Sequence, residues 1–468
     1  MGINTYIRYF QRQCCILSIA LFFFESRETA MADDEVVGGL WAMLAQERRK
    51  SIGLMFLRFI AVVLLAVAAC YLFINNFNSH LPETEKDTST IGKQELVNIW
   101  PLLKEWGVKE QQDLKKEVCD LSVGKWIPKP EGPSYTDETC HYIASYTNCL
   151  KNGRPDRGFL HWKWQPSGCD LPPFDPLKFL NAMRDKSWAF IGDAIFHNHA
   201  YSLLCLTSSV TKAHMIYYDG HDTRTWYFPS YNLTIYNIWS PYLLASETEN
   251  GPTHEIHLDI LDSKWTEMYD KYDYMVISGG QWFYKRTIMY ENNEVIGCHY
   301  CPDLELNKID YEVAYRRALQ LTFKFITTSE HKPFVVFRTW APSHWEDGES
   351  PSERICNRTK PFKEGEINGS SSDLKMWRLE TEEFEKAAAI GATNDVRMEL
   401  LDIYQLSLLR PDGHPGPYGT YHPFDDDPSK KVENDCIHWC LPGPIDSWNE
   451  LLMKVINRDV HNSVSAFL

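Results

Sequence analysis

The chain has 468 residues, enough for a large buried core and for more than one domain. Hydrophobic residues make up 44% of the chain, a proportion that excludes a wholly disordered protein. The formal net charge of −16 argues against a broad nucleic-acid-binding surface, so we expect the acidic balance to serve mainly solubility.

An apolar stretch near the N-terminus predicts a membrane anchor. Residues 54–74 carry a single charge, Arg58, and at ~1.5 Å per residue a helix of this length spans a bilayer core of ~30 Å. Basic residues at 48–50 precede it, which places the N-terminus in the cytosol under the positive-inside rule. The run is long and lacks a clear cleavage site, so we favour an uncleaved anchor over a removed signal peptide. The predicted division is a cytosolic tail at 1–53, a transmembrane signal anchor at 54–75, a stem at 76–118 and a lumenal domain at 119–468.

Cysteine usage agrees with an oxidising compartment for the region after the anchor. Ten of the thirteen cysteines lie from Cys119 to Cys440, and an even number there suggests disulfide bonds. The run Cys298–Cys301 is also compatible with a redox or metal motif, but the chain has no second CxxC, so a local disulfide is favoured. Three glycosylation sequons, at Asn232, Asn357 and Asn368, fall in the same region.

Strand-like and helix-like segments alternate after residue 119. Residues 119–180 are rich in Cys, Pro and Trp and predict a disulfide-tied flap with few regular elements. The predicted elements that follow, in chain order, are a strand at 188–192, a helix at 195–206, a strand at 272–278, a helix at 311–326, a strand at 334–338, a helix at 374–390, a strand at 398–404 and a helix at 445–455. This alternation predicts a three-layer α/β domain with a mainly parallel sheet, a fold that binds ligands at the carboxyl ends of its strands. Gly192-Asp193, Gly279-Gly280 and Arg338-Thr339 lie at such ends.

The junction after the first of these strands has the form of a nucleophile turn without a nucleophile. A strand that ends at Gly192-Asp193 and turns into a helix exposes the next residue where backbone N–H groups stabilise an oxyanion. A serine there would be a nucleophile, but the chain has Ala194, which keeps the backbone donor and supplies no oxygen. Ser202 lies two turns further on, at the wrong depth to replace it. The alternative is a turn without a function.

Near the C-terminus, an aspartate stands three residues before a histidine. In such a turn the Asp435 carboxylate would orient the His438 ring and stabilise its cation, and the ring would act as a general base. The motif is short, so a capping aspartate beside a surface histidine is an alternative. Zinc held by Cys436, His438 and Cys440 is another alternative, although a lumenal setting favours disulfides.

Tryptophans are more numerous than in an ordinary chain. Aromatic faces pack well on sugar rings, and their polar edges bond hydroxyl groups, but the default expectation for most of them is a core or flap position. Those that we single out are Trp162, Trp164, Trp226, Trp282, Trp340, Trp345 and Trp439.

Taken together, the motifs of the region after Cys119 resemble the plant trichome birefringence-like family of cell-wall polysaccharide O-acetyltransferases. The resemblance covers roughly three quarters of the chain. It rests on Cys119-Asp120 with Gly124 and Trp126, Asn148-Cys149, Asn152-Gly153-Arg154-Pro155-Asp156, Trp162-x-Trp164, Cys169-Asp170-Leu171-Pro172, Phe190-Ile191-Gly192-Asp193, Ser202-Leu203-Leu204-Cys205 and Asp435-x-x-His438-Trp439-Cys440-Leu441-Pro442-Gly443. It implies a fold similar to the SGNH (GDSL) esterases and a single-pass type II anchor in the Golgi membrane, with the catalytic domain in the lumen.

The resemblance also assigns site residues and shows where this chain departs from the family. The family carries G-D-S-x-x-R-N, and here Ala194 stands for the serine and His197 for the arginine, while Asn198 is kept. The implied catalytic pair is Asp435 with His438. Support for the site and its oxyanion is expected from Gly192, Asp193, Asn198 and Gly280.

The same resemblance implies a disulfide pattern and a substrate class. The expected pairs are Cys119–Cys169, Cys140–Cys205, Cys149–Cys440 and Cys356–Cys436, which leaves Cys298 for Cys301. The stretches around 297–301 and 337–348 most resemble the branch acting on xyloglucan and related hemicelluloses. No bound cofactor and no metal are expected. The partners expected are a polysaccharide acceptor, an acetyl donor, and Golgi acetylation or glycosyltransferase proteins.

Two functional hypotheses therefore stand. The first is a Golgi O-acetyltransferase that transfers acetyl groups to a hemicellulose, with xyloglucan favoured over mannan or xylan. The second is a catalytically inactive homologue that binds polysaccharide or an active relative, because the serine is Ala194. The intact Asp435–His438 pair favours the first hypothesis, and Ala194 with His197 favours the second.

Overall fold

The computed structural model describes residues 120–247, 253–346 and 354–467. The predicted tail, anchor and stem lie outside these ranges. In the part of the chain that the structure describes, no helix combines the length and the apolar character needed to cross a membrane.

A seven-stranded sheet forms the centre of the domain, in the order β13-β12-β9-β3-β6-β5-β4. The five strands from β13 to β6 are parallel, and β5 and β4 continue the sheet as antiparallel strands. Their bounds are β3 Ser187–Gly192, β4 His214–Tyr218, β5 Arg224–Phe228, β6 Leu233–Trp239, β9 Tyr274–Ile277, β12 Phe334–Arg338 and β13 Met398–Leu401. The central strands are buried on both faces, as continuous apolar runs in parallel sheets require.

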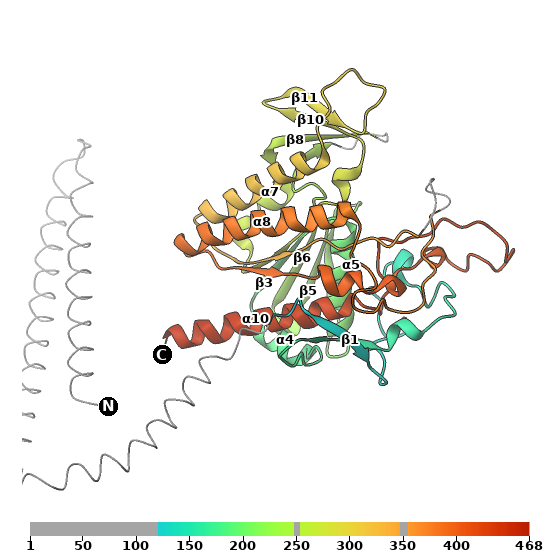
Figure 1. Cartoon of the computed structure of the whole chain (residues 1–468). Coiled ribbons are helices and arrows are strands. Elements are labelled where there is room, and N and C mark those ends of the chain that lie inside the picture. The colour runs from blue at the N-terminus through green and yellow to red at the C-terminus, as the bar shows by residue number, and fades with distance from the viewer. Residues whose placement is uncertain (1–119, 248–252, 347–353, 468) are drawn as a thin grey trace, which may run out of the picture. The chain divides into compact units, whose positions relative to one another are not determined.

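Helices cover both faces of this sheet, so the domain has three layers (Figure 1). On one face, α4 (Pro176–Ala182), α5 (Ala194–Thr207) and α10 (Asp446–Phe467) enclose a core around Trp188 and Phe190. On the other face, α7 (Tyr311–Thr328) and α8 (Ser371–Thr393) enclose a second core around Met275 and Phe337. Alternate residues of a strand point to opposite faces, so neighbours such as Ala189 and Phe190 belong to different cores.

A smaller sheet and two short helices belong to the same domain. The four strands β11-β10-β8-β7 form one sheet beside α7 (Figure 1). Their bounds are β7 Leu244–Glu247, β8 His254–Leu261, β10 Thr287–Glu291 and β11 Glu294–His299, and the short helices are α6 Ser263–Thr266 and α9 Tyr404–Leu408. The Cys298–Cys301 disulfide closes the end of β11.

The flap contains one antiparallel pair, β1 (Gly124–Pro128) with β2 (Trp162–Pro166), and otherwise short turns. Disulfides fasten it to the rest of the domain: Cys140 is bonded to Cys205 in α5, and Cys149 to Cys440 in the C-terminal loop. A further bond joins Cys356 to Cys436. These pairs are the ones that the family resemblance implies; Cys119, which it assigns to Cys169, lies outside the described residues.

The mixed α/β architecture is confirmed, with three differences from the predicted elements. The strand expected at 398–404 ends at Leu401, because the Asp402 side chain accepts the Tyr404 N–H at 3.1 Å and α9 begins there. The closing helix, expected at 445–455, runs from Asp446 to Phe467. Strand β6, the β4–β5 hairpin and the smaller sheet were not predicted, although β8 has Ile256, Leu258 and Ile260 at alternate positions, the period of a half-buried strand.

Candidate active site

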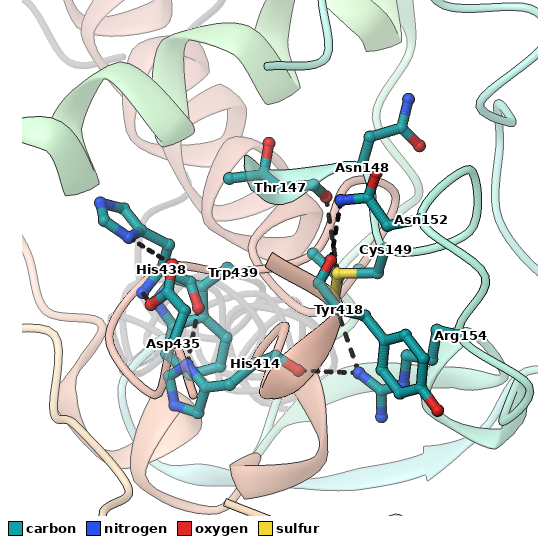
Figure 2. The surroundings of a disulfide bond; sticks show 12 residues. Thr147, Asn148, Cys149, Asn152, Arg154, His414, Tyr418, Asp435, His438 and Trp439 are labelled. Atoms are coloured by element: carbon teal, nitrogen blue, oxygen red, sulfur yellow. Dashed lines mark hydrogen bonds and ion pairs between the residues drawn. A yellow bond between two sulfur atoms is a disulfide. The ribbon is translucent and has the colours of Figure 1, made fainter. Parts of the chain in front are cut away.

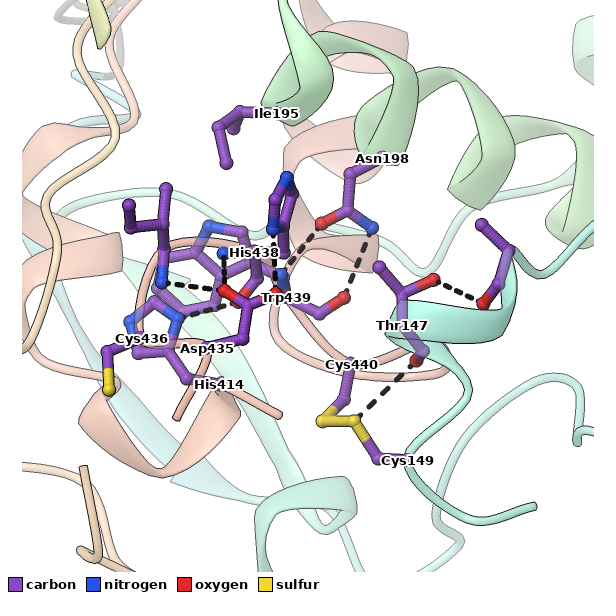
Figure 3. Close-up of polar contacts among 12 residues, drawn as sticks. Thr147, Cys149, Ile195, Asn198, His414, Asp435, Cys436, His438, Trp439 and Cys440 are labelled. Carbon is purple, nitrogen blue, oxygen red and sulfur yellow. Dashed lines mark hydrogen bonds and ion pairs between the residues drawn. A yellow bond between two sulfur atoms is a disulfide. The ribbon is translucent and has the colours of Figure 1, made fainter. Parts of the chain in front are cut away.

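Asp435 and His438 form a hydrogen-bonded pair in the loop that precedes α10 (Figure 3). The distance from His438 Nδ1 to Asp435 Oδ2 is 2.7 Å, while Asp435 Oδ1 accepts the backbone N–H groups of Ile437 and His438 at 3.1 and 2.9 Å. This turn holds the carboxylate against the ring within four residues. The side chains are 23% and 22% exposed for His438 and Asp435, so the pair is sheltered but reachable.

Asp435 and His438 shift each other's pKa. Burial alone lowers the pKa of His438, but the charge and hydrogen bond of Asp435 outweigh it, and the pKa is raised from its usual value. Burial raises the pKa of Asp435, but the charge and hydrogen bond of His438 together with two backbone N–H groups outweigh burial and lower that pKa, so the carboxylate stays ionised. Nε2 of His438 makes no hydrogen bond to any residue in the described ranges, so it is available to take a proton.

The turn between β3 and α5 presents Ala194 where the family has serine. A Cβ on Gly192 would meet the Ser278 carbonyl oxygen at 2.5 Å, so the strand end admits only glycine without a shift. Asp193 caps the helix, accepting the N–H groups of Ile195 and Phe196 at 3.0 and 3.4 Å. Ala194 opens α5 and is partly exposed among buried neighbours. The backbone of a nucleophile turn is therefore present, with the methyl group of alanine in place of the hydroxymethyl group of serine.

Asn198 connects this turn to the loop that carries Asp435 and His438, which we call the histidine loop (Figure 3). Its amide donates to the Trp439 carbonyl at 3.1 Å and accepts the Trp439 N–H at 2.7 Å. The Asp193 carboxylate also lies near enough to raise the pKa of His438. Residues about 240 positions apart are thereby brought into one site, as the motifs predict. Both polar atoms of Asn198 are used on Trp439, so its contribution is to position His438.

Buried charges lie beneath the turn. Arg338 donates to the Ser278 hydroxyl at 2.7 Å and is buried near Asp193 and Glu380. Burial raises the pKa of Asp193, against the opposing effect of Arg338. Burial also raises the pKa of Glu380 to about 8. The Arg338-Thr339 strand end thus contributes a cation, a role that the sequence did not reveal.

A second group of residues, not predicted from the sequence, contacts the backbone of the histidine loop (Figure 2). His414 Nδ1 lies 2.7 Å from the His438 carbonyl oxygen, and its Nε2 lies 2.7 Å from His344 Nδ1. Burial lowers the pKa of His414 to about 3 and that of His344 to about 4, so both rings are neutral. Arg154 of the flap donates to the His414 carbonyl at 2.8 Å. Arg154 had been singled out only by the family resemblance. His344 and His414 were missed because loop residues follow no helical or strand period.

His197, which stands for the family arginine, is buried one turn below Ala194. Its ring lies 5.3 Å from the Trp239 ring, and its Nε2 has no hydrogen-bond partner among the described residues. Burial, followed by the charge of Arg224, lowers the pKa of His197 to about 3. A neutral imidazole here supplies no fixed positive charge, which an arginine would supply.

The remaining expected positions are placed as follows. Gly280, after β9, has φ +111° and packs against Tyr315 and Trp340, so a side chain there would be strained; its oxyanion role stays a prediction. Asn232, Asn357 and Asn368 are all exposed. Cys436 and Cys440 are disulfide-bonded, which removes the zinc alternative at this loop. Among the described residues no group of three or more His, Cys, Asp or Glu is placed to hold a metal.

A parallel α/β sheet with a capped turn at one strand end and a His–Asp pair opposite it defines an esterase-like acyl-transfer fold. The family model described as the GDSL/SGNH-like acyl-esterase family found in Pmr5 and Cas1p matches residues 171–455, and the PMR5 N-terminal domain matches residues 117–170. The chain belongs to this family, together with the trichome birefringence-like proteins.

Similar proteins include trichome birefringence-like protein 26 of Arabidopsis thaliana, which is 50% identical over 73% of this chain and 78% of its own length. Trichome birefringence-like protein 23 of the same plant is 40% identical over 86% of this chain and 94% of its own length. Xyloglucan O-acetyltransferase 1 of Arabidopsis thaliana is 37% identical over 86% of this chain and 95% of its own length.

Proposed function

We propose that this protein is a Golgi-lumen O-acetyltransferase that transfers acetyl groups to hydroxyls of a hemicellulose. The observation that carries the proposal is the Asp435–His438 pair, held with Nε2 open beside the capped turn at Ala194. The names of its relatives support xyloglucan as the acceptor, with mannan or xylan as other candidates. The reaction needs an acetyl donor and no bound cofactor.

Without a serine hydroxyl the transfer must be direct. His438 Nε2 takes the proton of an acceptor hydroxyl as that oxygen attacks the acetyl carbonyl of the donor. The bond between the acetyl carbon and the donor's leaving group then breaks, and the imidazolium returns its proton to that group. Asp435 stabilises the imidazolium, and the backbone N–H of Ala194, which the Asp193 cap does not use, faces the developing oxyanion. No acyl-enzyme forms.

Direct transfer is expected to be slow. In triad enzymes loss of the serine costs on the order of 10⁶-fold in rate and leaves roughly 10³-fold over water. The second candidate is therefore a homologue that binds polysaccharide or an active relative without catalysis. Two specific observations favour it: Ala194 lacks the nucleophile, and His197 is neutral where the family has a cation.

The deciding experiment is an acetyl-transfer assay on the full chain with an acetyl donor and xyloglucan or mannan oligosaccharides, and with products detected by mass. Transfer above background that disappears in His438→Ala supports direct catalysis. Transfer only by Ala194→Ser supports the binding homologue. If neither the native chain nor Ala194→Ser transfers acetyl groups while both still bind the oligosaccharide, the acetyltransferase proposal is also rejected.

The cellular setting is proposed on the same basis. We expect a single-pass type II protein of the Golgi membrane with glycans on Asn232, Asn357 and Asn368, associated with Golgi acetylation or glycosyltransferase proteins. Exposure of these asparagines is compatible with glycan attachment. Microscopy of the tagged full chain, together with glycosidase sensitivity, tests this setting; a cytosolic, unglycosylated product would contradict it.

A further inference from the structure

The edge strand β4 exposes apolar side chains beside the active site. Met215, Ile216, Tyr217 and Tyr218 are each 45–59% exposed, and β4 is the last strand of the central sheet in the described part of the chain. Exposed apolar groups gathered on one edge are unusual for a protein surface and mark a binding surface.

The register of the hairpin divides these side chains between the two faces of the sheet. Met215 pairs with Trp226 and Tyr218 with Arg224, whereas Tyr217 pairs with Thr225 on the opposite face. Trp226 contacts the Tyr142 ring edge to face at 5.1 Å, and Arg224 donates to the Tyr201 hydroxyl of α5 at 3.0 Å. Tyr218 therefore lies on the α5 face, and Tyr217 does not.

The side chains on the α5 face continue to the catalytic pair. The Arg224 guanidinium lies 4.6 Å from the centre of the Tyr218 ring. Tyr146 follows Tyr142, the ring partner of Trp226, in the same short segment of the flap. Its ring is 4.8 Å from the His438 ring. Tyr218, Arg224, Trp226, Tyr142 and Tyr146, which we name the aromatic row, thus lead from β4 toward His438, while the buried Tyr201 holds Arg224 through its hydroxyl.

The chemistry of the row fits a neutral, ring-bearing polymer. Aromatic faces accept the apolar faces of pyranose rings, while hydroxyls such as that of Tyr218 line the edge. The turn between β4 and β5 carries Asp219 and Asp222 close to Arg224 in the sequence, so the hairpin has no excess of positive charge to attract an anionic ligand. A second copy of the chain would pair along the outer edge of β4, whereas the row runs inward to His438.

We propose that the aromatic row binds several consecutive sugar rings of the acceptor polysaccharide and thereby presents one hydroxyl to His438. This inference rests on the proposed function, since it assigns the acceptor subsite of that same site. The inference adds the direction in which the polysaccharide approaches the site, across the β4–β5 hairpin, and the residues that bind it.

The test compares Tyr218→Ala with Tyr217→Ala, a matched control on the same strand with an exposed ring on the opposite face. Binding of a xyloglucan oligosaccharide and of glucose to the detergent-solubilised full chain is measured by calorimetry. Loss of one stacked ring is expected to weaken oligosaccharide binding about three- to tenfold in Tyr218→Ala and to leave Tyr217→Ala unchanged. Tyr218→Phe keeps the ring, so it should bind like the native chain even though its hydroxyl no longer donates to the His221 carbonyl.

Other outcomes overturn the proposal. Equal oligosaccharide binding by all the variants, or no binding by the native chain, rejects the row. A native dimer that both alanine variants dissociate, with sugar binding unaffected, assigns β4 to a second copy. Acetyl transfer is measured separately, in Ala194→Ser. If Ala194→Ser transfers acetyl groups while Tyr218→Ala binds sugar as well as the native chain does, the proposed function stands and only the aromatic row is rejected.

Discussion

The histidine loop and the start of α5 meet in one site, but they differ in how their chemistry depends on side chains. In the loop, the Asp435–His438 pair is itself made of side chains, and residues remote in sequence such as Asn198 and His414 hold its backbone. At the turn, Gly192 and Asp193 set the backbone geometry, and the side chain of residue 194 plays no part in it. A turn can therefore lose its nucleophile without losing its shape.

Restoring the missing oxygen is the strongest way to probe this difference. Ala194→Ser should raise acetyl transfer by about 10³-fold or more, because the rest of the site is in place. The rate is measured with the full chain and a xyloglucan oligosaccharide. The control is Ala194→Ser combined with His438→Ala, which should return to the background rate. An inactive but folded Ala194→Ser would mean that His197 or another difference also disables the turn.

The opposite change weakens His438 as a base and leaves the turn at residue 194 as it is. Asp435→Asn in the Ala194→Ser background should lower the rate by about 10²-fold or more, because the imidazolium is no longer stabilised. Asp435 raises the pKa of His438, so its removal lowers that pKa.

Neutral His438 is the base, hence the rising limb of the rate against pH should move to lower pH in Asp435→Asn. An unmoved pH profile would show that another group titrates.

The Cys149–Cys440 bond tests how firmly the flap holds the loop. Replacing both cysteines by serine should cost about 2–5 kcal/mol of unfolding free energy, because the bond spans 291 residues of sequence. Denaturant unfolding under oxidising conditions measures this. The matched control is the double serine variant of Cys298 and Cys301, which are only 3 residues apart and should change stability less. Equal losses would contradict the loop-length argument.

Asn198 tests the link between the two regions. Asn198→Ala leaves the Trp439 N–H and carbonyl without partners in a buried place, so we expect a loss of about 2 kcal/mol in unfolding free energy. The acetyl-transfer rate of the Ala194→Ser background should fall as well, because His438 is no longer positioned. Asn307→Ala, at an exposed position, serves as the control and should change neither quantity. A stable but inactive Asn198→Ala would make its role purely positional.

Four of the five parallel strands were predicted, but β6 and the antiparallel strands were not. Runs such as Trp188–Gly192 and Phe334–Arg338 are buried on both faces, so their apolar character appears directly in the sequence. The β4 strand is exposed at every residue and has no apolar period to reveal it. The hydrogen-bonded Asp435–His438 pair was predicted because its members stand three residues apart. His344, His414 and Tyr146 were missed because they reach the pair only through loops and through segments distant in sequence.

By itself, the sequence determined the mixed α/β class, the absence of an oxygen at residue 194 and the aspartate–histidine turn, because each depends on a local pattern or on a single side chain. Tertiary structure decided what surrounds them. It brought Asn198 to Trp439, placed neutral His414 behind the loop and set Tyr218 and Tyr217 on opposite faces of one strand. Such placements depend on strand register and on contacts between distant segments, which packing of the whole core fixes.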